Sequence, residues 1–131
     1  MIYADANVII RLIEGNEATR TPIERRLLPF RETGRFILTS RLTTLECLVL
    51  PVRNHDTALL ALYDAFFAGF EVEVAELTAA VVEKATFLRA ALDVKTPDAL
   101  HLAIAILSGA TAFLTGDKGL TRCTEVPVEV F

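Results

Sequence analysis

Hydrophobic and polar positions follow two different periods along the chain, and short apolar runs typical of buried strands come at intervals. Such runs lie at residues 1–5 ("MIYAD"), 35–40 ("RFILTS") and 112–117 ("AFLTGD"). Residues 70–77 ("FEVEVAEL") alternate between apolar and charged positions as far as Val74 and carry three glutamates, which is typical of a strand at a sheet edge. Residues 126–131 ("VPVEVF") close the chain as a fifth expected strand.

The segments between these runs repeat their apolar positions every three to four residues and therefore predict helices. The expected helical segments are residues 6–15, 19–34, 42–52, 55–70, 78–94 and 95–110. Thr78 is a candidate cap, and Thr96 with Pro97 predicts the start of a helix that ends at Gly109. That last helix is apolar almost all round, so we expect it to be buried.

Strands that alternate with helices predict a parallel sheet covered on both faces. The expected fold class is α/β: a three-layer α/β/α sandwich around a mostly parallel five-stranded sheet. At 131 residues, 53% of them hydrophobic, the chain can bury one substantial core, so residues 1–131 are expected to form a single domain.

The start of the chain lacks the basic segment of a signal peptide, and no run reaches the ~18 apolar residues of a membrane span. Cys47 and Cys123 lie far apart without paired spacing, which favours free thiols in a reducing compartment. A cytoplasmic protein with no membrane partner is the expectation.

The net charge of −4 speaks weakly against a nucleic-acid partner, but the charges are unevenly distributed. Residues 1–53 hold eight arginines against six acids, a balance of +2, whereas residues 54–131 hold five bases against eleven acids, a balance of −6. Arginine supplies ten of the thirteen basic residues, and its planar fork suits phosphate. A phosphate-bearing partner therefore stays open, beside the simpler view that these are solvated arginines.

Four acidic residues are expected at one edge of the sheet. Asp5 ends the first strand, Asp117 follows the fourth, Asp98 lies in the first turn of the last helix, and Glu46 lies early in the helix after the second strand. Parallel strands end at a common edge, which is where open α/β sheets bind ligands. Taken singly, Asp98 could serve the helix dipole and Asp117 an ordinary turn.

The position of Glu46 around its helix is harder to explain by solvation alone. At 100° per residue it falls between Leu42 and Leu50, in an arc that also holds Leu45 and Val49. A merely solvated glutamate would point away from such an arc, so we expect Glu46 to serve a site.

Carboxylates packed together repel and raise one another's pKa values unless a cation lies among them. All four acids offer hard oxygen ligands, and these motifs supply no thiolate or histidine ligand, which favours Mg²⁺ or Mn²⁺ over zinc. Such ions lower the pKa of a bound water and stabilise a leaving oxygen in phosphodiester hydrolysis. Metal-dependent phosphoryl chemistry is the predicted activity.

The motifs together resemble the PIN domain, and in particular the ribonuclease toxins of VapC type from toxin–antitoxin pairs. The resemblance spans the chain and depends on "YADANVII", the lone Glu46, "FLRAALDVKTPDALHLAIAI" and "FLTGDKGL". Leu120 stands where the family often has an aromatic residue, a difference that bears on packing.

The resemblance implies a metal-dependent endoribonuclease in which Asp5, Glu46 and Asp98 carry Mg²⁺ or Mn²⁺ and Asp117 is a fourth, more variable acid. It also implies that Asn7 and Thr115 support these ligands without binding the metal themselves. Expected partners are single-stranded or looped RNA, a second copy of the chain, and a cognate antitoxin that inserts a segment into the acidic groove.

Several further residues have both a candidate role and a simpler explanation. Arg11 and Arg41, near strand ends, are candidate phosphate contacts, although both could pair with surface acids. A lone histidine on an apolar helix, such as His101, is more often a satisfied core residue than a proton carrier, and His55 is expected to be exposed. For the homodimer, the leucine- and phenylalanine-rich segment 42–70 is a candidate surface.

Two alternatives to the nuclease remain on the sequence alone. A metal-dependent phosphohydrolase would use Asp5 as a nucleophile. It would need a second aspartate where Asn7 stands and a lysine at a strand end, whereas Lys118 only adjoins Asp117. A non-catalytic module would use the acids to hold a structural cation or a basic peptide.

Overall fold

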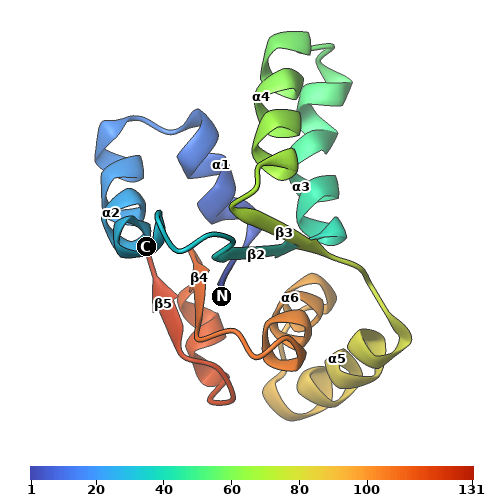
Figure 1. Cartoon of the computed structure of the whole chain (residues 1–131). Helices are drawn as coiled ribbons and strands as arrows, with labels where there is room; N and C mark the ends of the chain where they lie inside the picture. Colours follow the sequence, from blue (N-terminus) through green and yellow to red (C-terminus); the bar gives the residue numbers. More distant parts are fainter.

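The computed structural model describes residues 1–131 and contains one five-stranded sheet with strand order β3-β2-β1-β4-β5 (Figure 1). Every neighbouring pair of strands is parallel, with Ile2 of the central strand opposite Ile37 on one side and Ala112 on the other. The strands are β1 (Ile2–Ala4), β2 (Ile37–Ser40), β3 (Val72–Ala75), β4 (Ala112–Thr115) and β5 (Val128–Val130). The predicted fold class is confirmed, and the charged strand β3 lies at an edge as expected.

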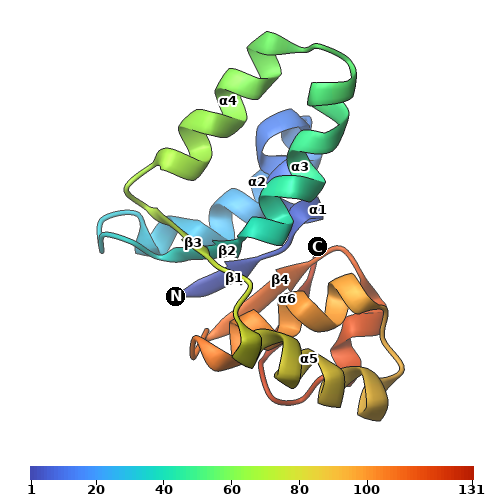
Figure 2. The same cartoon turned by 90° about the vertical axis from the view of Figure 1, so that its right-hand side faces the viewer.

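Helices cover both faces of the sheet, with α1 to α4 on one face and α5 and α6 on the other (Figures 1 and 2). In both views α3 and α4 form a hairpin that projects beyond the sheet. The helices are α1 (Ala6–Glu14), α2 (Glu17–Leu27), α3 (Arg41–Arg53), α4 (Thr57–Ala68), α5 (Ala79–Leu92) and α6 (Thr96–Leu107), with short 3₁₀ turns η1 (Leu28–Phe30) and η2 (Lys118–Arg122). None of these helices is long and apolar enough to cross a membrane.

Successive residues of each strand point to opposite faces of the sheet and pack into two separate cores. Tyr3, Leu38 and Phe113 point toward α5 and α6, and the rings of Tyr3 and Phe113 stack with centroids 5.0 Å apart. Ile2 and Leu114 instead pack with α1 to α4. Since both faces are buried, the strands read as unbroken apolar runs, which is why they were found from the sequence.

Helix starts follow the predicted capping chemistry in one case and depart from it in another. The Thr78 side chain accepts a hydrogen bond from Val81 N at 3.2 Å and caps α5, as predicted. The prediction of Thr96 as the cap of α6 was wrong, because Thr96 is already helical and its hydroxyl accepts from Arg89 instead. The cap position is Lys95, without a side-chain bond, and Pro97 in the first turn has no N–H to satisfy.

Both cysteines are free and buried, as expected. Burial raises the pKa of the Cys47 thiol to about 12, so Cys47 is an unreactive part of the core. His55 is exposed, also as expected, in a left-handed conformation between α3 and α4.

Candidate active site

Asp5 follows β1 directly and caps the next helix. Its backbone N–H donates to Leu114 O, which ties it to β4, and its Oδ1 accepts from Val8 N at 3.1 Å at the start of α1. Only 7% of the residue is exposed. Burial raises the pKa of Asp5, and the charge of Glu46 adds to the rise, while hydrogen bonding by Thr115 and Val8 opposes it.

Asp98 and Asp117 face a common pocket. Asp98 lies in the first turn of α6, and Asp117 follows β4, where its Oδ1 accepts from Gly119 N at 2.7 Å. Both line a pocket of about 170 Å³ that also contains Lys95 and Arg122. Burial, and then the charge of Asp117, raises the pKa of Asp98. A cation placed among these groups would relieve that repulsion.

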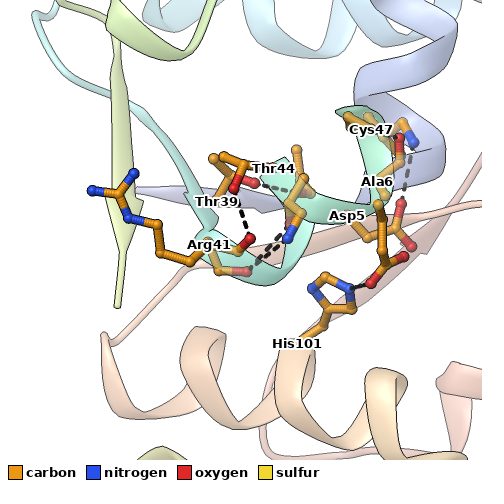
Figure 3. Close-up of polar contacts among 12 residues, drawn as sticks. Asp5, Ala6, Thr39, Arg41, Thr44, Cys47 and His101 are labelled. Atoms are coloured by element: carbon orange, nitrogen blue, oxygen red, sulfur yellow. Dashed lines mark hydrogen bonds and ion pairs between the residues drawn. The ribbon is translucent and has the colours of Figure 1, made fainter. Parts of the chain in front are cut away.

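Glu46 is held by a buried histidine from the other face of the sheet. Its Oε1 lies 2.8 Å from His101 Nε2, and the other ring nitrogen, Nδ1, lies 2.6 Å from the Tyr3 hydroxyl. The His101 ring extends from α6 toward Asp5 and the start of α3 (Figure 3). His101 is therefore a satisfied core residue, as predicted, and it also contacts one of the four acids.

The leucine arc of α3 does not point where the sequence analysis placed it. Leu45, Val49 and Leu50 are exposed, and the buried face of α3 is formed by Thr43, Cys47 and Pro51. The helix is apolar on several sides, and the side that carries Cys47 packs on α1, where the thiol faces Ala6 O. Glu46 still reaches the acids, because it lies at the boundary of this face with 34% of its side chain exposed.

Electrostatic coupling joins the four acids into one cluster. The charge of Glu46 raises the pKa of both Asp5 and Asp98, and His101 opposes the rise at each. As the side chains lie, no three of the chain's Asp, Glu, His or Cys residues converge tightly enough to enclose a metal ion. Their chemistry nevertheless fits one, because the acids offer only oxygen ligands and two of them are disfavoured as anions.

Comparison with known proteins identifies the family of the chain. The PIN domain family matches residues 2–126. The chain belongs to the PIN domain family. No curated protein matches the sequence.

Solved structures share the fold at low sequence identity. VapBC2 from Rickettsia felis, bound to a promoter DNA fragment, superposes with a TM-score of 0.80 at 18% identity, covering 99% of this chain and 98% of that one. VapC20 from Mycobacterium tuberculosis, a sarcin–ricin loop cleaving toxin, gives 0.74 at 20% identity, covering 97% and 99%. FitAcB from Neisseria gonorrhoeae gives 0.67 at 18%, covering 98% and 96%. These three structures are similar in fold to the present chain.

The two predicted supporting residues of the PIN domain differ in position. Thr115 is fully buried, and its hydroxyl accepts from Asp117 N at 3.0 Å while it stabilises the ionised form of Asp5. Asn7 is exposed in the first turn of α1, and no hydrogen bond joins it to the acids. Thr115 thus links two of the acids.

Both predicted phosphate contacts are engaged within the chain. Arg41 pairs with Glu76 at 2.9 Å on the exposed surface. Arg11 donates to Phe131 O and lies against Gly116, where an added Cβ would be 3.0 Å from Arg11 Nη2. Arg11 is therefore adjacent to the acid cluster, whereas Arg41 borders a separate pocket near β3.

Sequence reasoning missed two basic residues that share a pocket with two of the acids. Lys95 and Arg122 share the pocket of Asp98 and Asp117, and Lys95 lowers the pKa of Asp98. Lys95 adjoins the "TPD" motif, so its proximity could have been inferred. Arg122 could not, because η2, which carries it, was not predicted.

Proposed function

We propose that this PIN domain is a metal-dependent endoribonuclease that hydrolyses RNA phosphodiester bonds and is the toxin of a VapBC-type pair. The observation that supports the proposal is the position of Asp5, Glu46, Asp98 and Asp117 in the fold: Asp5 and Asp117 follow β1 and β4, Asp98 lies in the first turn of α6, and Glu46 lies in α3 directly after β2. Residues 1–131 would act as one nuclease domain.

The residues that would hold Mg²⁺ or Mn²⁺ are Asp5, Glu46, Asp98 and Asp117. When bound, the ion would supply Lewis acidity and a water of lowered pKa. The chain itself orients the ligands: Val8 N–H fixes Asp5, and Gly119 N–H fixes Asp117. Thr115 supports two acids directly, and Asn7 is proposed to do so only as the family implies.

Basic side chains beside the acids would bind the substrate backbone. Lys95 and Arg122 border Asp98 and Asp117, and Arg11 lies against Gly116. Cations at this position can hold RNA phosphates without reading the base sequence. Arg41 would contribute only if it left Glu76.

The proposed protein partners are a cognate antitoxin and a second copy of the chain. The similar structures include VapBC and FitAB complexes. We propose that an antitoxin segment enters the acidic groove and that the homodimer forms through the exposed apolar stripe Leu45, Val49 and Val52 of α3. The two free cysteines favour the reducing cytoplasm as the location.

Cleavage of single-stranded RNA in Mn²⁺ tests the activity, with Asp5→Asn as the inactive variant. Asp56→Asn is a matched control, because Asp56 caps α4 through Leu59 N at 3.1 Å, as Asp5 caps α1, but is not one of the acids at the site. Cleavage that persists in Asp56→Asn and is lost in Asp5→Asn supports the nuclease.

Two other outcomes would contradict the proposal. A trapped aspartyl-phosphate on Asp5 would indicate a phosphohydrolase. The absence of both cleavage and trapped phosphate would indicate a binding module.

For the homodimer, light scattering of Val49→Lys should show a monomer, and an unchanged dimer would refute the assigned surface.

A further inference from the structure

A buried chain of polar groups runs from the core to the acid cluster. Tyr3 of β1 is fully buried, and its hydroxyl donates to Ser40 Oγ at 3.1 Å and lies 2.6 Å from His101 Nδ1. His101, 3% exposed, then meets Glu46 Oε1 through Nε2 at 2.8 Å. The Glu46 carboxylate can only accept, so Nε2 carries the proton of this bond, and with Nδ1 at the Tyr3 hydroxyl both ring nitrogens have a partner that fixes the ring plane.

The contact connects elements that lie on opposite faces of the sheet. His101 (Figure 3) belongs to α6 in one helical layer, and Glu46 belongs to α3, which lies in the other layer (Figure 1). The rest of the buried surface of α6 is apolar, formed by residues such as Leu102 and Ile104. A polar side chain at this position must be satisfied, and its outer partner here is a proposed metal ligand.

We propose that His101, oriented by Tyr3, is a positioning residue that fixes the Glu46 carboxylate toward the metal-binding edge. The inference rests on the proposed metal-dependent function. Glu46 is a flexible side chain with 34% of its surface exposed, so without a partner it would sample several rotamers. The bond to Oε1 selects one orientation and leaves Oε2 available to a cation.

Hydrogen bonds to ligating side chains commonly change metal affinity by about 10- to 100-fold. We therefore expect His101→Leu, which removes both bonds, to weaken Mn²⁺ binding by about that factor. His101→Gln should restore most of the affinity, because its amide N–H can replace Nε2 as a donor to Glu46. Tyr3→Phe should weaken Mn²⁺ binding less than His101→Leu does, since the imidazole ring of His101 keeps its contact with Glu46.

The experiment is calorimetric titration of the purified full chain with Mn²⁺, together with thermal melts of each variant. Tyr63→Phe is the matched control for Tyr3→Phe, because it also removes a buried hydroxyl contact, in this case to Glu14. It should leave Mn²⁺ affinity unchanged. If His101→Leu does not fold, Tyr3→Phe decides between the two roles, because the proposal expects it to bind Mn²⁺ more weakly than the wild type.

A purely structural role would lower the melting temperature of the His101 and Tyr3 variants and leave their Mn²⁺ affinity at the wild-type value. That result, or a wild-type protein that binds no Mn²⁺, would overturn the inference. A wild-type protein that binds Mn²⁺ with the expected order of variants but cleaves no RNA would support the inference and contradict the proposed function.

Discussion

Replacing Asp5 by asparagine separates the charge of this residue from its structural role. Asparagine and aspartate cap helices about equally well, so the bond to Val8 N is expected to survive. What is lost is a negative charge on a side chain that is 7% exposed and whose pKa is raised, chiefly by burial. In metal-free buffer the variant should therefore be as stable as the wild type or more stable.

The size of the metal effect follows from linkage and chain length. A ligand at 100 times its Kd stabilises a protein by about 2.7 kcal/mol. With an unfolding entropy of about 2.1 cal/mol/K per residue, a chain of 131 residues shifts its Tm by about 4 °C for each kcal/mol. Saturating Mn²⁺ should thus raise the Tm of the wild type by about 10 °C and that of Asp5→Asn by much less.

Differential scanning calorimetry in EDTA and in Mn²⁺ measures both effects. Asp5→Ala serves as a second variant that also loses the cap, at a cost of about 0.5–2 kcal/mol in either buffer. Asp56→Asn, the matched cap variant, should show the full metal shift of the wild type.

Equal shifts by Mn²⁺ in the wild type and in Asp5→Asn would show that Asp5 is not a ligand. A marked loss of stability of Asp5→Asn in EDTA would show that the charge of Asp5 stabilises the metal-free fold, for instance through His101. Either result would refute the reasoning.

Three further predictions concern stability. Because burial raises the folded pKa of Asp5 and Asp98, the folded state holds their protons more tightly than the unfolded chain does. Their contribution to stability therefore falls as pH rises from the usual carboxyl value of about 3.9 through the raised pKa values. In urea unfolding without metal, the free energy by which Asp5→Asn is more stable than the wild type should grow from pH 4 to pH 7, and a constant difference would contradict this. Arg26→Met removes a paired contact to Glu129 at 2.7 and 2.9 Å and should cost about 0.5–1 kcal/mol without affecting cleavage, as denaturation and RNA assays would show. Gly15→Ala should cost about 1–3 kcal/mol in the same urea assay, since its Cβ would lie 2.3 Å from Arg11 O, and an unchanged midpoint would contradict this.

The strands could be predicted because burial on both faces leaves a continuous apolar run, as in β1, β2 and β4. Their order in the sheet could not be read from the same runs. That β1 lies at the centre, between β2 and β4, depends on how the crossovers pack, and no local pattern records it. The central position matters, because it places Asp5 between the ends of its neighbours.

The orientation of α3 shows where periodicity fails. Apolar side chains occupy several sides of this helix, so a calculation from residue angles cannot choose the face that packs. The side with Thr43 and Cys47 is the one that packs, and Leu45, Val49 and Leu50 are left exposed. That Glu46 serves a site stays a prediction, and its contact with His101 spans 55 positions and leaves no trace in either local motif.

The fold tolerates four nearby carboxylates because two of them lie at the starts of α-helices. Asp5 caps α1 and Asp98 lies in the first turn of α6, where the helix dipole favours a negative charge by about 0.3–1 kcal/mol each. This compensation is incomplete, since the pKa of each remains raised. The metal-free fold therefore retains an electrostatic cost at this edge. Residues that weaken a fold while meeting at one place are better explained by a ligand than by packing.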